Sequence, residues 1–183
     1  MKKAVFLDRD GVLNRTDLVY GIPKPPANLG NIEILPGVIE AIEILKKNDF
    51  VPVVVTNQPD VARGVIRRSD VEEINSAIGQ AIGIRHFYTC FHDDSDFCDC
   101  RKPAPGLIYR ASLELHLSIK DSFLVGDRWR DISAGQAAGC QSFFIDYSYR
   151  ELKPKMPFKK VSSLLEAVKI IVGEKNETKF RFS

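Results

Sequence analysis

Short apolar runs alternate with segments of helical period along this chain, and this alternation limits its fold more than any other feature. Five runs rich in Val, Ile and Phe have the length of buried strands and lie at residues 4–7, 51–55, 86–89, 122–125 and 142–145. Helical spacing of apolar residues is found at 38–45, from 69 to 77 or 82, and at 106–115, 131–138 and 161–172. Strands that alternate with helices build parallel sheets covered on both faces. We therefore predict an α/β fold, a Rossmann-like three-layer α/β/α arrangement with a central, mainly parallel sheet of about five strands.

The continuous pattern and the length of 183 residues predict a single domain. We expect this domain to span residues 1–173 and the polar residues 174–183 to form a frayed tail. The proline-rich segment 15–31 is expected to be a loop, and no insertion is long enough for a large cap domain. A site at the sheet should therefore be fairly open, with selectivity left to the loops at 15–31 and 90–100.

The charge balance argues against several classes of partner. Lys and Arg (26) nearly equal Asp and Glu (24), and the formal net charge of +2 gives no global field for nucleic acid or an anionic membrane. The apolar residues 4–7 are too few for the core of a signal peptide, and no run approaches the length of a membrane span. We expect a cytoplasmic monomer that binds neither nucleic acid nor membrane.

Acidic residues follow two of the predicted strands. Asp8 and Asp10 come directly after the first strand, and Asp127 comes after the fourth, with Asp131 close behind it. Ligand sites in open parallel sheets lie outside the carboxyl ends of the strands, so these side chains should meet there. Carboxylates that meet repel one another, and Mg²⁺, which prefers oxygen ligands, would resolve the conflict. Each acid alone could instead cap a helix or a turn, and only their combination favours a metal site.

An aspartate beside Mg²⁺ can attack phosphorus, and the chain offers the other groups that such a reaction needs. Asp8 and Asp10 could divide the tasks of nucleophile and general acid/base. Thr56 and Asn57 follow the second strand and could bind phosphoryl oxygens, while Lys102 could neutralise charge on the transferring group. In isolation, Thr56 and Asn57 could equally start a turn, and Lys102 could be a solvated surface lysine.

A second group of ligand-type residues consists of Cys90, His92, Cys98 and Cys100. Three thiolates and one imidazole make a closed tetrahedron for Zn²⁺, which is typical of a structural site. A redox pair or buried thiols are the alternatives, but cytosolic cysteines stay reduced and the paired spacing favours a metal. Because Arg101 and Lys102 come directly after this group, closing the metal loop would fix the direction of both cations.

Four motifs, in this order, resemble those of the haloacid dehalogenase superfamily of phosphohydrolases. They are Asp8-Arg9-Asp10-Gly11-Val12-Leu13, Thr56-Asn57-Gln58, Lys102-Pro103 and the segment from Gly126-Asp127 to Asp131. The resemblance implies that Asp8 is the nucleophile of an aspartyl-phosphate mechanism and that Asp10 is its general acid/base. It also implies that Asp8, Asp127 and the carbonyl of Asp10 bind Mg²⁺, with Asp131 in a supporting role.

The cysteine loop, from Cys90-Phe91-His92 to Cys98-Asp99-Cys100-Arg101-Lys102-Pro103, looks like the zinc loop of the heptose bisphosphate 7-phosphatases. The segment from Gln58 to Ala62-Arg63-Gly64 is similar to one that borders the substrate in those enzymes. This closer resemblance implies removal of the C7 phosphate of D-glycero-D-manno-heptose 1,7-bisphosphate. The implied substrate-binding residues are Thr56, Asn57, Gln58, Arg63, Arg101, Lys102 and Arg128.

Other functions stay open at this point. Histidinol-phosphate phosphatases have a similar zinc loop, so histidinol phosphate or another small sugar phosphate is an alternative substrate. Arginines near the motifs suit a second phosphate, whereas histidinol phosphate should prefer acidic or aromatic partners. A non-catalytic, zinc-stabilised binding module is the alternative of another class, against which the Asp8 and Asp10 pair argues. The long 15–31 loop, and Arg128 where lysine is usual, leave the substrate in question.

Overall fold

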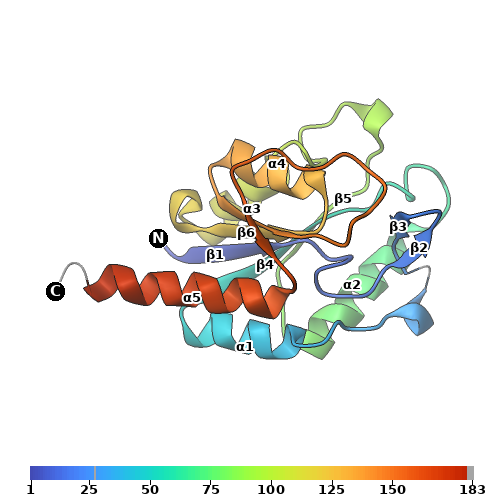
Figure 1. The fold of residues 1–183 in the computed structure, drawn as a ribbon. Coiled ribbons are helices and arrows are strands. Elements are labelled where there is room, and N and C mark those ends of the chain that lie inside the picture. The colour runs from blue at the N-terminus through green and yellow to red at the C-terminus, as the bar shows by residue number, and fades with distance from the viewer. Residues whose placement is uncertain (27, 181–183) are drawn as a thin grey trace.

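A parallel sheet lies between two layers of helices (Figure 1). The computed structural model describes residues 1–26 and 28–180, with side chains as far as residue 173. Within these residues the central sheet has six strands in the order β5-β4-β1-β6-β7-β8, and all neighbouring pairs run parallel. The strands are β1 (Lys3–Leu7), β4 (Phe50–Asn57), β5 (Phe87–Cys90), β6 (Phe123–Gly126), β7 (Gln141–Ile145) and β8 (Lys159–Val161). The predicted three-layer α/β fold is confirmed, with one strand more than expected.

The helices divide between the two faces of the sheet. One layer consists of α1 (Val38–Lys47), α2 (Arg68–Ile82) and α5 (Leu164–Phe180), and the other of α3 (Gly106–Leu115) and α4 (Trp129–Ala138). Because side chains alternate along a strand, β1 serves both layers. Val5 and Leu7 pack on the side of α1, whereas Ala4 and Phe6 pack on the side of α3. Burial on both faces explains why β1 reads as a continuous apolar run.

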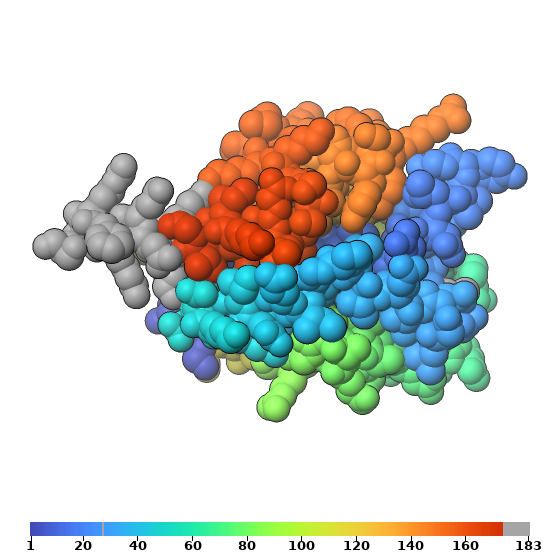
Figure 2. All heavy atoms as spheres, turned by 60° about the horizontal axis from the view of Figure 1, so that its bottom comes forward, coloured from blue at the N-terminus to red at the C-terminus, as the bar shows by residue number. Residues whose placement is uncertain are grey.

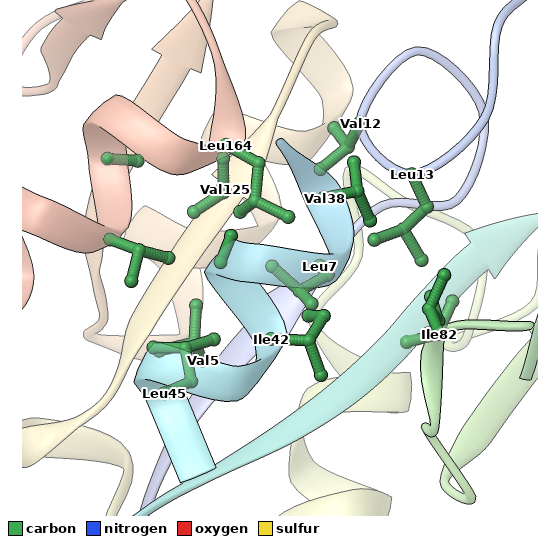
Figure 3. Close-up of a cluster of buried hydrophobic side chains, with 14 of the residues drawn as sticks. Val5, Leu7, Val12, Leu13, Val38, Ile42, Leu45, Ile82, Val125 and Leu164 are labelled. Carbon is green, nitrogen blue, oxygen red and sulfur yellow. The ribbon is translucent and has the colours of Figure 1, made fainter. Parts of the chain in front are cut away.

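Helix α1 illustrates how the larger core is built (Figure 3). Its Val38, Ile42 and Leu45 recur at helical spacing, are buried, and pack with Val5 and Leu7 of β1. Burying a side chain of this size contributes about 1.5–3 kcal/mol. On the outside, α1 and α5 lie side by side and cover this face of the sheet (Figure 2).

The sequence pattern does not predict two of the elements. The segment 15–31 contains an antiparallel hairpin of β2 (Asp17–Val19) and β3 (Ile22–Lys24) instead of a loop without strands. Tyr20 and Gly21 form its turn with φ of 53° and 80°, the left-handed conformations that a two-residue hairpin turn needs. Strand β8 has two exposed lysines and only Val161 buried, so it lacks the apolar signal of the other strands. Short strands with lysines are common at sheet edges.

The C-terminal helix is longer than expected. Helix α5 extends to Phe180, past the predicted end at Val172, so the backbone of the expected frayed tail is helical as far as that residue. Residues 181–183 of the predicted tail lie outside the described residues. Among the residues described, no helix is both long and apolar enough to cross a membrane.

The carboxyl ends of β1, β4 and β6 share one end of the sheet, on the side of the hairpin β2–β3 in Figure 1. Asp8 follows β1, Asn57 ends β4 and Asp127 follows β6. Because β1 pairs with β4 on one side and with β6 on the other, the residues after these strands are neighbours in space. The fold thus brings the polar motifs of the sequence to one place.

Candidate active site

Three carboxylates meet beyond the ends of β1 and β6. Asp8 follows β1, Asp127 follows β6, and Asp131 lies in the first turn of α4. One carboxylate oxygen of each lies within 4.8 Å of the others, and the residues are 8%, 1% and 1% exposed. Asp131, for which the sequence predicts a supporting role, is as close to the group as the other two. We call these three residues the carboxylate cluster.

Lys102 supplies a positive charge to this cluster. Its side chain is 3% exposed, and its ammonium lies 2.9 Å from Asp8 Oδ1 and 2.5 Å from Asp131 Oδ1. It also donates to the backbone carbonyl of Val55 at 2.8 Å. An ammonium group has three hydrogens, so these partners use all of them. Lys102 is therefore fixed as a point charge between Asp8 and Asp131.

One ammonium group does not balance three buried carboxylates. Burial and the nearby charge of Asp131 raise the pKa of Asp8 to about 6, against the opposite effect of Lys102. Burial and the charges of Asp8 and Asp131 raise the pKa of Asp127 well above its usual range. Burial opposes the charged form of Lys102, but Asp131 and Asp8 outweigh it and raise the pKa of the ammonium. With all four groups ionised, the surplus of two negative charges equals the charge of one divalent cation.

The oxygens of Asp127 give a direct sign of where such a cation would bind. Asp127 Oδ2 accepts a hydrogen bond from the Tyr149 hydroxyl at 2.8 Å. Its Oδ1 is buried and has no partner among the described residues. A buried, charged oxygen without a partner is costly, and Mg²⁺ takes carboxylate oxygens as ligands. The donor set of the carboxylate cluster therefore fits Mg²⁺.

Two glycines allow the carboxylates to approach the backbone. A Cβ on Gly11 would lie 2.0 Å from Asp127 Oδ2, and the φ of +82° at this residue is unfavourable for other side chains. A Cβ on Gly126 would lie 2.2 Å from the Cβ of Asp131. A larger residue at either position would displace a member of the carboxylate cluster.

Asp10 is held by a separate set of donors. Arg9 donates to it through Nε and Nη2, with the shortest contact at 2.9 Å. Asn14 and Gln58 add hydrogen bonds of 3.0 and 2.8 Å. Arg9 is itself fully buried, and its Nη1 donates to Asn75 of α2 at 2.9 Å. Asp10 thus has a counter-charge of its own, independent of Lys102.

Thr56, Asn57 and Gln58 at the end of β4 orient neighbouring groups. Gln58 donates to the Thr56 hydroxyl at 2.9 Å as well as to Asp10. The Asn57 amide donates to the carbonyl of Lys102 at 3.0 Å and accepts from its N–H at 3.1 Å. Asn57 therefore fixes the segment that delivers Lys102. Contact of these side chains with a phosphoryl group stays a prediction.

A cavity of 290 Å³ opens beside the carboxylate cluster. Asp8, Asp10, Asp127 and Asp131 line it. The segment 15–31 contributes Thr16, Ile22, Pro23, Lys24 and Pro25, and the cysteine loop and its flank contribute Asp94 and Arg101. Both loops from which we expect selectivity therefore reach the cavity. A larger, open groove of 1480 Å³ runs along β5 and contains none of these carboxylates.

Carboxylates of the cysteine loop hold three of the arginines that line the cavity. Asp93 accepts from Arg63 at 2.8 Å, and these hydrogen bonds lower the pKa of Asp93 to about 2. Asp94 bridges Arg101 at 2.8 Å and Arg130 at 2.9 Å. The guanidinium groups are thus aimed by a loop rather than left mobile. We call Asp93, Asp94 and the three arginines that they hold the rim.

Several residues of the site are absent from the sequence prediction. Arg130 and Asp94 lie inside the segments that carry the motifs, so the spacing could have suggested them. Tyr149 and Glu151 follow β7 and belong to no motif. Glu151 forms an ion pair with Arg128, which places the predicted Arg128 at the cavity but already paired. Only the folded chain brings these two residues to the site.

Cys90, the last residue of β5, comes together with His92, Cys98 and Cys100 of the loop that follows. Their Sγ atoms are 3.3 to 3.8 Å apart, and His92 Nδ1 lies 3.3 Å from Cys100 Sγ. A tetrahedral zinc site implies ligand separations of about 3.5–3.8 Å. The cluster could therefore hold a metal ion. Arg101, the next residue, donates to the His92 carbonyl at 3.2 Å, so a contact within the loop holds its guanidinium. That a bound metal ion would fix the direction of Arg101 and Lys102 stays a prediction.

This chain is similar to known proteins of one kind. Residues 26–139 match the family described as haloacid dehalogenase-like hydrolase. The D-glycero-beta-D-manno-heptose-1,7-bisphosphate 7-phosphatase of Pasteurella multocida (strain Pm70) is 34% identical over 149 residues, which cover 75% of this chain and 78% of that protein. The enzyme of the same name from Escherichia coli (strain K12) is 36% identical over 147 residues, which cover 74% of both chains.

This chain is also similar to solved structures. The D,D-heptose 1,7-bisphosphate phosphatase from B. bronchiseptica, in complex with magnesium and phosphate, is similar with a TM-score of 0.83 and 25% identity. The match covers 94% of this chain and 99% of that one. The corresponding enzyme from Burkholderia Thailandensis, at 23% identity and a TM-score of 0.65, shares the fold.

Proposed function

This chain belongs to the haloacid dehalogenase-like hydrolase family, and from that premise we propose that it is a Mg²⁺-dependent phosphatase of D-glycero-D-manno-heptose 1,7-bisphosphate that removes the C7 phosphate. The observation that carries the proposal is the buried carboxylate cluster around Lys102, which lines a cavity of 290 Å³. The names of the relatives supply the substrate.

Asp8 is the nucleophile in this proposal. Its Oδ1 accepts from the backbone N–H of Arg9 at 2.8 Å and from Lys102 at 2.9 Å, while its Oδ2 accepts no hydrogen bond from the described residues. A carboxylate oxygen of Asp8 attacks phosphorus, the bond to the sugar oxygen breaks, and an aspartyl-phosphate forms on Asp8. When bound by Asp8, Asp127 and the Asp10 carbonyl, Mg²⁺ supplies charge stabilisation at the phosphoryl oxygens.

Asp10 is the general acid/base. It gives a proton to the departing sugar oxygen, takes one from the water that then attacks phosphorus, and so returns Asp8 and inorganic phosphate. The donors Arg9, Asn14 and Gln58 hold the Asp10 carboxyl group beside the cavity. Separate counter-charges for Asp8 and Asp10 suit two carboxyl groups with different tasks.

The rim supports a substrate with a second phosphate. Arg63, Arg101 and Arg130 line the cavity, and Lys24 of β3 joins them without an ion-pair partner among the described residues. Guanidinium groups bind phosphate with paired N–H donors, and the ammonium of histidinol phosphate would meet their repulsion. The heptose bisphosphate is therefore favoured over histidinol phosphate.

The cysteine loop is proposed to hold a structural Zn²⁺ ion. The tetrahedral arrangement of Cys90, His92, Cys98 and Cys100 supports this assignment. The ion would hold Asp93 and Asp94, and through them the arginines of the rim. The proposed unit of function is one domain of residues 1–173, and cytoplasmic location and a monomeric state stay predictions of the sequence.

Phosphate release tests the function directly. The purified protein with Mg²⁺ is offered both anomers of heptose 1,7-bisphosphate, histidinol phosphate and fructose 1,6-bisphosphate, and kcat/KM is compared. We expect kcat/KM for the better heptose anomer to exceed that for histidinol phosphate by at least about tenfold, because a second phosphate contributes more than about 1.4 kcal/mol at paired guanidinium groups. A preference for histidinol phosphate would favour that alternative substrate. No phosphate release from any of these compounds would favour the non-catalytic binding module.

A further inference from the structure

Tyr149 belongs to no sequence motif, but its hydroxyl contacts the carboxylate cluster. The residue follows β7 and is 7% exposed. Its hydroxyl donates to Asp127 Oδ2 at 2.8 Å, and a weaker contact joins it to the Thr16 hydroxyl at 3.4 Å. The shorter of the two contacts is therefore with Asp127, whose Oδ1 is buried and has no partner among the described residues.

We propose that Tyr149 is a positioning residue for the divalent cation. The two oxygens of a free carboxylate are equivalent, and either could bind the metal. The hydrogen bond from Tyr149 occupies Oδ2 of Asp127, fixes the rotation of the carboxylate and leaves Oδ1 for the ion. Hydrogen bonds to metal ligands commonly change metal affinity by about 10- to 100-fold when they are lost. The inference rests on the proposed Mg²⁺-dependent function, but it concerns ion binding and not the choice of substrate.

The surrounding chain holds Tyr149 in place. The next residue, Arg150, donates its backbone N–H to the carbonyl of Gly21 at 3.0 Å, which ties the segment to the hairpin β2–β3. Glu151 forms an ion pair with Arg128, the residue after Asp127. The two residues after Tyr149 therefore anchor its segment to the hairpin and to the neighbour of Asp127, which holds the hydroxyl at the same oxygen.

The test compares Tyr149→Phe with Tyr147→Phe. Tyr147 stacks on Tyr149 with ring centroids 5.5 Å apart, and it does not line the cavity. Both changes delete one hydroxyl from neighbouring rings and keep the packing of the rings. Mg²⁺ alone is titrated into the protein after chelation, and heat release gives its Kd. We expect Tyr149→Phe to raise the Kd for Mg²⁺ about tenfold and Tyr147→Phe to leave it within about twofold.

A second measurement separates positioning from a purely structural role. The Mg²⁺ concentration for half-maximal phosphate release should rise by a similar factor in Tyr149→Phe, while the rate at saturating Mg²⁺ recovers to within about threefold of the wild type. A variant that melts earlier but binds Mg²⁺ as tightly as the wild type would overturn the proposal.

The two proposals fail in different ways. In one case the wild-type protein binds Mg²⁺ and Tyr149→Phe weakens this binding, but no phosphate is released from any sugar phosphate. The proposed function would then be wrong, and the role of Tyr149 would be supported. A wild-type protein that binds no Mg²⁺ would overturn both.

Discussion

The carboxylate cluster and the rim are built in opposite ways. The cluster is enclosed at strand ends, where the side chains of Asp131 and Lys102 are 2% and 3% exposed. The rim is held by loops, and the side chains of Arg63 and Asp94 are 42% and 56% exposed. Buried charges interact strongly because water does not screen them, whereas an exposed ion pair contributes about 0–1 kcal/mol. Changes in the cluster should therefore abolish the reaction, and changes at the rim should alter which substrate reacts.

The largest effect is expected from Asp8→Asn. The amide cannot attack phosphorus, so phosphate release should fall by at least about 10⁴-fold. The change also removes one of the crowded carboxylates, so the Tm in EDTA should not decrease. Retention of more than one hundredth of the activity in a folded variant would contradict the role of Asp8 as nucleophile.

The next effect is expected from Gly11→Ala, with Gly64→Ala as its matched control. Both residues have positive φ, of +82° and +68°, but a Cβ on Gly64 meets nothing within 4 Å. The unfavourable φ alone should cost about 1–2 kcal/mol in each variant. Gly11→Ala should in addition displace Asp127 and weaken Mg²⁺ binding by more than tenfold. Equal Mg²⁺ affinities in the two variants would show that the close contact is relaxed elsewhere.

The pH dependence of stability should separate the two regions. The pKa of Asp8 is raised from 3.8 to about 6, so folding favours its protonated form. The stability from this group is full below about pH 4 and is lost as the pH rises through 6, on the order of 1–3 kcal/mol. Asp93 at the rim has a pKa of about 2 and stays ionised throughout. In EDTA the Tm should therefore decrease from pH 5 to pH 7.5, and saturating Mg²⁺ should stabilise the protein more at the higher pH; a flat profile in EDTA would contradict this.

Loss of the loop metal should act on the rim and spare the cluster. Cys98→Ser should lower bound zinc, measured by metal analysis, and raise KM for the heptose bisphosphate by about tenfold, because Asp93 and Asp94 would no longer hold the arginines. With p-nitrophenyl phosphate, which has one phosphate, kcat should change by less than about threefold. Cys140→Ala, at a buried thiol outside the loop, is the control. An equal loss of kcat on both substrates would place the loop inside the catalytic machinery.

The smallest effect is expected from Asp94→Asn. This change removes the negative charge shared by Arg101 and Arg130, but the amide oxygen in its place can still accept their hydrogen bonds. The arginines therefore stay oriented while a substrate phosphate meets less competition for them. KM for the heptose bisphosphate should fall about two- to threefold at low ionic strength, and the difference should disappear at high salt. Asp99→Asn is the control within the same loop, because Asp99 is exposed and makes no contact with these arginines among the described residues. A rise in KM would show that orientation by Asp94 outweighs its competition with phosphate.

The sequence predicts those parts of the molecule that depend on local pattern. The strand β1 is a continuous apolar run because both of its faces are buried. Because Asp8 comes directly after that run, its position at a strand end can be predicted. The candidate metal site of the cysteine loop is equally local, because its four ligand-type residues are close in sequence. Strand β8 has a single buried residue, and the two hairpin strands bury only Pro23, so their apolar residues do not alternate with polar ones. These elements depend on tertiary contacts that local periodicity does not encode.

The partners of the predicted residues were harder to predict than the residues themselves. Tyr149 reaches Asp127 across 22 residues of sequence, and Asn75 reaches Arg9 across 66. Neither tyrosine nor asparagine carries a spacing signal for such a contact. Asn57 has a motif, but the structure shows its amide paired with the backbone of Lys102. The sequence predicts the candidate residues, and the fold determines how they are oriented.

The buried guanidinium of Arg9 ties the assembly of the site to the assembly of the core. Arg9 is fully enclosed and is satisfied by Asp10 on its own loop and by Asn75 on α2. If α2 were not packed in place, the Arg9 guanidinium would lose Asn75 and stay partly desolvated, at a cost of several kcal/mol. The loop after β1 and helix α2 are therefore stable together and unstable apart. The chain should fold to its reaction centre in one cooperative event, and partly folded molecules with a working centre should be too rare to contribute.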